Sequence, residues 1–389
     1  MRSRNSLAFL RTETIIDEQE GEVTERREEA SKFFHESLSC FQICLTKQEE
    51  QYTLTQQAFS SPVTSAASDE NHEEQHLDED TDAQDAQPDS WYSVEEPVTI
   101  ETLLDTCKAQ LETLKALCSV QSGSSRKEVR LIESSYLDYL EPKILKYSSN
   151  SEKEAEISVI RTAFVAALAC ARFRTSTTNL EVFEHEFNQA IGEVEHSPGL
   201  NADVQYLSIV ADANIDFDAA VEERLLHSAI PSEGLETVNR LRWKHITKSL
   251  DEYTNASRLH RLPNLARIHL SRGDCELLRA RLADEPFNYA LASQSRTTLI
   301  QNAAVFYGAA DKVMSNDLSD PEDMDDKIEV GVKLALVAGL QGRPEDLLAL
   351  LQGKPLDTRQ KLQSMKEQRL LSQKTWSSIE EILNPAVGF

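Results

Sequence analysis

The sequence has 389 residues, a hydrophobic content of 40% and a formal net charge of −26 at pH 7. So large an acidic excess argues against nucleic acid as a direct ligand and against docking on an anionic membrane, because both need a basic face. Only 12 Gly and 12 Pro are present, which favours helices over sheets. The chain has no Walker loop, no G-x-G-x-x-G and no G-x-S-x-G, so we expect no enzyme activity and no cofactor.

Targeting signals are weak. No stretch approaches 18 apolar residues, so we expect no membrane-spanning helix, and acidic residues from Glu13 onward argue against a signal or transit peptide. Six cysteines in a chain of this length are typical of reduced thiols, and we expect those at 40 and 44 to be buried helical thiols rather than zinc ligands. These features favour a cytoplasmic or nuclear protein.

Residues 1–57 form an N-terminal amphipathic segment. Its spacing predicts one helix over 25–57. The apolar stripe of that helix consists of Ala30, Phe33, Phe34, Leu38, Phe41, Ile43, Cys44 and Leu45. Such a stripe is too apolar to stay exposed, so we expect the helix to fold back onto the later repeats, within the helical domain at 95–389.

Residues 58–94 are predicted to be a disordered acidic linker. No Lys or Arg occurs from Gln48 to Cys107, and residues 69–89 contain ten Asp or Glu. Such a composition buries too little apolar surface to offset the entropy of ordering. The run is either a solvated linker or an interaction tail for a basic client. In the second case its contact residues are Asp78, Glu79, Asp80 and Asp82.

Residues 95–389 show a nearly continuous helical pattern. Helices are expected from about 98 to 117, over 127–147 with Pro142 as a kink or break, over 154–173 and over 179–191. The helix at 154–173 is apolar nearly all round, which predicts a place in the middle of the packing. Short connections and the lack of strand-like alternation predict an all-α domain of antiparallel helix pairs.

Three glycines, Gly273, Gly308 and Gly342, are spaced 35 and 34 residues apart, and each follows a similar helical stretch. A second pattern places a small residue, an aromatic residue and another small residue on one helix face. It occurs at Ser37-Phe41-Cys44, Ser249-Tyr253-Ala256 and Ala303-Tyr307-Ala310, with a weaker form at Phe183-Phe187-Ala190. The Gly308 and Ala303 patterns are incompatible, because one assigns 299–311 to a first helix and the other to a second.

Together these patterns resemble the tetratricopeptide (TPR) superfamily. The best-matched positions are Leu265, Ala266, His269 and Gly273, and the stretch 331–351 matches equally well. The resemblance covers 235–352 and, more weakly, 153–230, although Leu278 and Leu347 replace an expected small residue. It implies a TPR-like α-α superhelix whose groove, lined by first helices, binds segments of partner proteins. An unrelated helical bundle is the alternative.

The first-helix pattern places a small residue where a neighbouring helix crosses. We therefore expect Ala266, Ala304 and Ala335 to be buried contact points between helices. A further acidic run, from Asp317 to Asp326, lacks the spacing of an EF-hand loop and is interpreted as a solvated connection before a helix at Lys327.

A basic island interrupts the acidic chain. Residues 240–281 contain ten Lys or Arg against four acids. These side chains either balance nearby acids on exposed helix faces or line a groove that clamps a carboxylate, as some TPR domains do. The clamp residues would be Arg258, Arg261, Asn264, Arg267 and Asn302. The acidic run at 69–89 is an alternative, intramolecular partner for this island.

Three functions remain open. The first is a non-enzymatic interaction scaffold or dedicated chaperone whose groove and acidic surface bind a basic protein partner. The second is a co-chaperone or targeting adaptor that reads an acidic peptide terminus through the island at 240–281. The third is an enzyme with a site in the helical groove, which would need converging acids or a metal that no motif selects.

Overall fold

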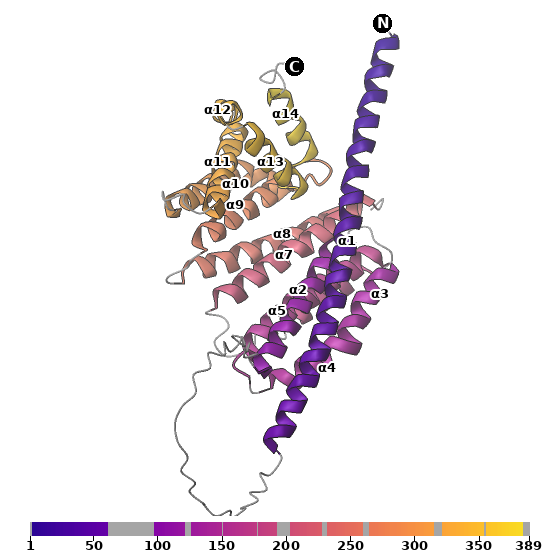
Figure 1. Cartoon of the computed structure of the whole chain (residues 1–389). Coiled ribbons are helices and arrows are strands. Elements are labelled where there is room, and N and C mark those ends of the chain that lie inside the picture. Colours follow the sequence, from indigo (N-terminus) through magenta and orange to yellow (C-terminus); the bar gives the residue numbers. More distant parts are fainter. Residues whose placement is uncertain are drawn as a thin grey trace, which may run out of the picture.

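The structure, a computed structural model, describes residues 2–60, 97–120, 126–149, 151–176, 178–192, 203–227, 232–259, 264–314, 321–353 and 355–383. Every regular element in these ranges is a helix and none is a strand, so the prediction of an all-α chain is confirmed there (Figure 1).

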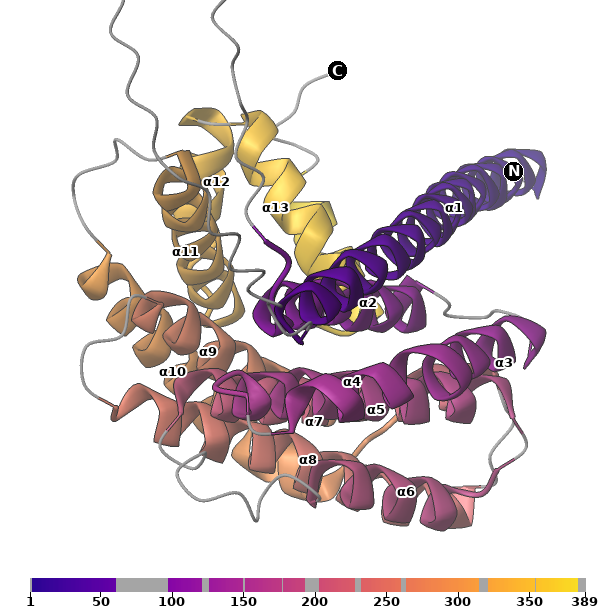
Figure 2. The same cartoon turned by 60° about the horizontal axis from the view of Figure 1, so that its bottom comes forward.

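The N-terminal layer is built on one long helix, α1 (Arg2–Ser60), which lies along α2 (Ile100–Val120) and near α4 (Glu141–Ser148) (Figure 2). Leu38 and Leu45 are buried in this contact, and Glu49 accepts hydrogen bonds from Lys143 and Tyr147. The fold-back contact expected for the N-terminal segment is therefore made by the C-terminal half of α1.

The bounds of α1 differ from those predicted. The helix starts at Arg2 rather than at 25, and residues 58–60, which were assigned to the linker, belong to it. Residues 61–94, with the four acids predicted to contact a partner, lie outside the described residues.

The predicted apolar stripe of α1 is only partly buried. Leu38 and Leu45 are buried, but Phe33, Ile43 and Cys44 are exposed. Cys40 is also exposed, so the expectation that Cys40 and Cys44 are buried was wrong. The eight stripe residues cover more of the helix circumference than one packing face can cover, because successive residues on a helix are about 100° apart.

A continuous helical segment follows α2. It consists of α3 (Arg126–Ser134), a π-helical turn at Ser135–Leu140 and α4. Pro142 lies in the first turn of α4, so the chain remains helical instead of breaking there. Because proline has no backbone N–H, one hydrogen bond of the helix is missing at Pro142. The wider π-helical turn lies directly before this missing bond.

Helix α5 (Glu154–Thr175) occupies the middle of the packing, as its apolar sequence predicts. Phe164 is buried in the core formed with α1, α2, α3 and α4. Cys170 and Phe173 are buried in the larger core formed with the helices that follow. A helix that is apolar on both sides thus joins two cores.

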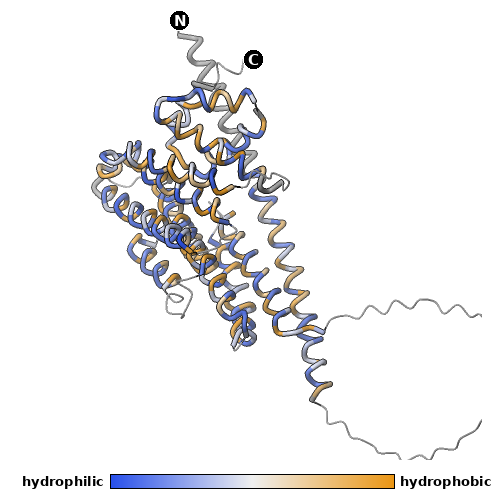
Figure 3. Tube along the Cα trace, turned by 90° about the vertical axis from the view of Figure 1, so that its left-hand side faces the viewer, coloured by the Kyte–Doolittle hydropathy of each residue, from blue (hydrophilic) through white to orange (hydrophobic). Residues whose placement is uncertain are grey.

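Most of the later helices pack against the next helix in the chain, and apolar residues gather where neighbouring helices face one another (Figures 1 and 3). They are α6 (Leu180–Gly192), α7 (Val204–His227), α8 (Ser232–Ser257), α9 (Leu265–Arg281), α10 (Ala290–Val313), α11 (Pro321–Leu340), α12 (Glu345–Gly353), α13 (Pro355–Glu367) and α14 (Gln373–Leu383).

Three of the four small–aromatic–small sets are buried as one face of a helix: those on α6, α8 and α10. On α8 the Tyr253 hydroxyl donates to Asp212 of α7, and on α10 the Tyr307 hydroxyl donates to Asp274 of α9 at 2.7 Å. The pairs α7–α8 and α9–α10 therefore share one packing device. The set on α1 differs, because Cys44 is exposed.

The three glycines do not occupy equivalent places. Gly273 lies within α9 beneath the Tyr307 ring, Gly308 lies within α10 with open space around it, and Gly342, with φ +86°, follows α11. The set around Ala303 is buried as one face of α10, whereas Gly308 borders open space, so the burial agrees with the Ala303 pattern rather than with the glycine spacing. Ala266, Ala304 and Ala335 were expected to be buried contact points between helices. Ala335 is buried, but Ala266 and Ala304 are only half-buried, so the expectation was wrong for two of the three residues.

Candidate groove between α10, α11 and α12

A groove with a volume of about 510 Å³ opens between α10, α11 and α12. Its floor is the face of α11 that carries Gly331, Leu334, Ala335 and Ala338. Because most of these side chains are small, α11 leaves room that larger residues would fill. The walls are formed by Ala304 from α10 and by Ala349 and Leu350 from α12.

The wall on α10 is open to solvent. Val305, beside Ala304, is 68% exposed, and a methyl group added at Gly308 would meet nothing within 4 Å. Gly331 and Gly339 on α11 have the same free space. An apolar side chain from outside would therefore meet apolar surface here without displacing a protein side chain.

One end of the groove is polar. Gln341 and Arg343 from the turn between α11 and α12, and Asp346 from the first turn of α12, line the groove there, and Arg343 donates to the Gln341 side chain at 2.9 Å. Gly342 makes this turn with its positive φ, and the Arg343 backbone N–H donates to the Ala338 carbonyl at 2.9 Å. This is the typical C-terminal cap of a helix.

The surroundings of the groove are acidic. Residues 321–353 contain seven Asp or Glu against three Lys or Arg. Part of this charge comes from the run at 317–326, whose second half was expected to be a loop but forms the first turns of α11. Carboxylates are favoured at a helix N-terminus by its dipole. Asp326 pairs with Arg267 at 2.9 Å and Asp325 with Lys361 at 2.6 Å.

A buried lysine holds the floor of the groove in place. Lys333 of α11 points away from solvent and pairs with Asp274 of α9 at 2.7 Å and with Glu329 at 2.8 Å. Burial favours loss of its proton, but the two carboxylates outweigh burial and raise the pKa of Lys333. Since Asp274 also accepts from Tyr307, one carboxylate ties α11 to both α9 and α10.

The basic island is mostly paired within the protein. Arg242 is fully buried and donates to Asp218 at 2.7 Å and to Glu222. Arg281 also donates to Glu222. Burial raises the pKa of Asp218, whereas at Glu222 burial is outweighed by Arg242 and Arg281, which lower the pKa. Arg242 and Arg281 therefore form buried ion pairs that join α7, α8 and α9.

The residues predicted for a carboxylate clamp are dispersed. Arg258 and Asn264 are exposed at either side of the α8–α9 connection, and Arg261 lies outside the described residues. Arg267 is engaged by Asp326, and Asn302 donates to Glu276 at 3.0 Å.

Antiparallel packing separates the last two of these residues. Asn302 of α10 lies beside Glu276, nine residues beyond Arg267 on α9. At a rise of 1.5 Å per residue this corresponds to roughly 14 Å along the helix. A single carboxylate does not span that distance, so the structure does not bring the clamp residues together.

Comparison of the whole chain with protein-family models finds no match. Comparison with curated proteins finds none either. The chain also matches no solved structure. Among the described residues, no helix has both the length and the apolar composition that crossing a bilayer requires, and no three His, Cys, Asp or Glu side chains are arranged to hold a metal ion.

Sequence reasoning found part of the groove and missed the rest. Ala304 and Ala335 were singled out, but as helix-contact points rather than as groove residues. Gly331 and Ala349 were missed. A signal was present, because glycine is unfavourable inside a helix and α11 contains two, Gly331 and Gly339.

Proposed function

We propose that this chain is a non-enzymatic interaction scaffold of the TPR-like type that binds a segment of a basic partner protein in the groove between α10, α11 and α12. The observation that carries the proposal is the small-residue floor of α11, flanked by Ala304 and Ala349, which leaves about 510 Å³ open to solvent. Helix-in-groove recognition uses such a surface, because the apolar face of the incoming helix fills it.

Charge supports a basic partner. The groove opening carries Asp346 beside exposed Glu345, and the helices that form it contain an excess of acids. Complementary charge increases the association rate more than it increases affinity. A dedicated chaperone that shields a basic client is the form of scaffold that this combination favours.

The adaptor function is less well supported. It needs free basic side chains at 240–281, but Arg242, Arg281 and Arg267 are engaged by carboxylates of the same chain. An acidic peptide would have to displace those partners. We therefore favour the groove over the basic island.

The proposal is tested with a variant whose added side chain fills the groove. The partner is first captured from the native organism with stringent salt washes and identified by mass spectrometry. Ala349 is exposed on α12 and borders the groove, so Ala349→Trp is expected to fill the space without disturbing the core. Partner affinity should then fall at least tenfold, because the anchor side chains lose their pocket.

The matched control is Ala155→Trp, which adds the same side chain at an exposed position of α5, far along the chain from the groove. It should leave affinity unchanged. Neutralising Glu345 and Asp346 together should mainly lower the association rate and its salt dependence. Equal affinity of the parent and the Ala349→Trp chain would contradict the proposal.

A further inference from the structure

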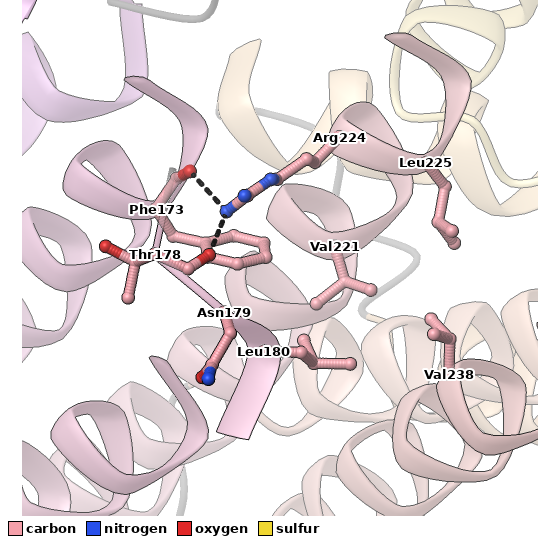
Figure 4. Close-up of a pocket in the computed structure, with 8 residues that line it drawn as sticks. All are labelled: Phe173, Thr178, Asn179, Leu180, Val221, Arg224, Leu225 and Val238. Atoms are coloured by element: carbon pink, nitrogen blue, oxygen red, sulfur yellow. Dashed lines mark hydrogen bonds between the residues drawn. The ribbon is translucent and has the colours of Figure 1, made fainter. Parts of the chain in front are cut away.

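A second, smaller cavity lies where α5, α6, α7 and α8 meet (Figure 4). Its volume is about 210 Å³. An apolar cavity of 150 Å³ holds a benzene molecule, so this one has room for a ring and a few further carbons. It shares no lining residue with the groove of the proposed function.

The lining is apolar at one end and cationic at the other. Leu180, Val221, Leu225 and Val238 surround the apolar end, and Figure 4 shows Arg224 extending from α7 across the Phe173 ring. The guanidinium lies 4.3 Å from the centre of that ring.

The backbone fixes the position of this guanidinium. One terminal nitrogen, Nη1, donates to the Thr178 carbonyl at 2.6 Å and to the Phe173 carbonyl at 3.2 Å. Both carbonyls lie where α5 ends and the chain turns to α6, so Arg224 caps the end of α5. The side chain is thereby held in place before any ligand arrives, which lowers the entropy that binding would cost.

Arg224 has no acidic partner in the described part of the chain. Nearby arginines on α5, α8 and α9 each pair with a carboxylate: Arg174 with Glu223, Arg242 with Asp218, and Arg281 with Glu222. Arg224 is half-buried, and its partners are the two backbone carbonyls and the Phe173 ring, so no carboxylate among the described residues neutralises its charge. Burial also lowers the pKa of Arg224, which a bound anion would reverse.

We infer that this cavity binds a small monocarboxylic acid, with its apolar body among Leu180, Val221, Leu225 and Val238 and its carboxylate on Arg224. An apolar cavity selects size and shape, and a planar guanidinium suits a carboxylate better than a neutral amide. This site is separate from the partner groove, so it stands whether or not the proposed function is correct.

The test compares two isosteric probes on the full chain by saturation-transfer NMR and calorimetry: 3-phenylpropanoate and 3-phenylpropanamide. The acid should bind about tenfold or more tightly than the amide, because its hydrogen bond to Arg224 is charge-assisted. In Arg224→Gln this preference should disappear. Arg130→Gln, which removes an exposed arginine from α3, should leave it unchanged.

A second variant covers the case in which Arg224→Gln does not fold. Leu225→Trp keeps the guanidinium and fills the apolar end, so both probes should bind at least tenfold more weakly. Equal binding of acid and amide to the parent chain would overturn the inference. So would a preference that survives in a folded Arg224→Gln chain, or binding that is unaffected by Leu225→Trp.

Discussion

Replacing Arg242 with Met is expected to lower the free energy of unfolding by about 3–5 kcal/mol. Arg242 is fully buried and its guanidinium reaches Asp218 and Glu222 on α7. Without it, Asp218 loses the cation with which it pairs, and Glu222 keeps only the partners that reach it from α9 and beyond. The loss of stability arises because a buried carboxylate is left without a compensating cation. It does not measure the net stabilisation that the ion pair provides.

Urea denaturation of the full chain measures this effect. The control is Arg267→Met, which removes an ion pair whose arginine is 51% exposed and should cost less than about 1 kcal/mol. A chain that combines Arg242→Met with Asp218→Asn should recover part of the loss, because a neutral amide is cheaper to bury than a charge and Glu222 stays paired with Arg281. Similar losses for the two single arginine variants would show that the network does not hold α7, α8 and α9 together.

Substituting Gly273 with Ala is expected to destabilise the chain by about 1–3 kcal/mol through overpacking. The added methyl would lie 2.2 Å from Cε1 of Tyr307, far inside van der Waals contact. The Tyr307 ring cannot move aside freely, because it is completely buried and its hydroxyl donates to Asp274.

The same substitution at Gly308 should have the opposite sign. Nothing lies within 4 Å of the added methyl, and Ala is the better helix former by up to about 1 kcal/mol. Truncating Tyr307 to Leu should reduce the cost of Gly273→Ala, since the two residues are coupled by contact. If Gly273→Ala and Gly308→Ala changed the free energy of unfolding by the same amount, the contact between Gly273 of α9 and Tyr307 of α10 would be contradicted.

These two glycines show what sequence spacing could and could not reveal. A helical pattern and a repeat-like spacing were enough to predict an all-α chain, the central place of α5 and the buried face of Tyr307. The equal spacing of Gly273 and Gly308 was misleading, because one glycine accommodates a ring and the other borders open space. That difference depends on which residue of the neighbouring helix lies opposite, which no local pattern records.

The charged residues were harder to place for a similar reason. Arg242 and Arg267 are both members of one basic run, yet the first is buried and the second half-exposed. Their partners come from α7 and α11, far away in the sequence. Arg224 was overlooked because no local pattern distinguishes it, and only the tertiary structure places its guanidinium on the Phe173 and Thr178 carbonyls beside a cavity.

The location of the groove could not be predicted from the sequence. The family resemblance implied a groove lined by first helices, a register that stays a prediction; the groove found here has α11 as its floor, with Ala335 among the lining residues. The other half comes from α12, a nine-residue helix whose packing against α11 depends on the turn at Gly342. A turn at a glycine after a helix can be predicted from the sequence. The groove that this turn leaves between α11 and α12 cannot.

Site-specific photo-crosslinking from Val305 tests the central claim most directly. Val305 follows the groove residue Ala304 on α10 and is 68% exposed, so a photoreactive residue there should capture a basic partner bound in the groove. The same residue at Leu131, exposed on α3, should not capture it. The account predicts a crosslink from Val305 that Ala349→Trp abolishes. Capture from Leu131 alone, or capture from Val305 that persists with the groove filled, would contradict it.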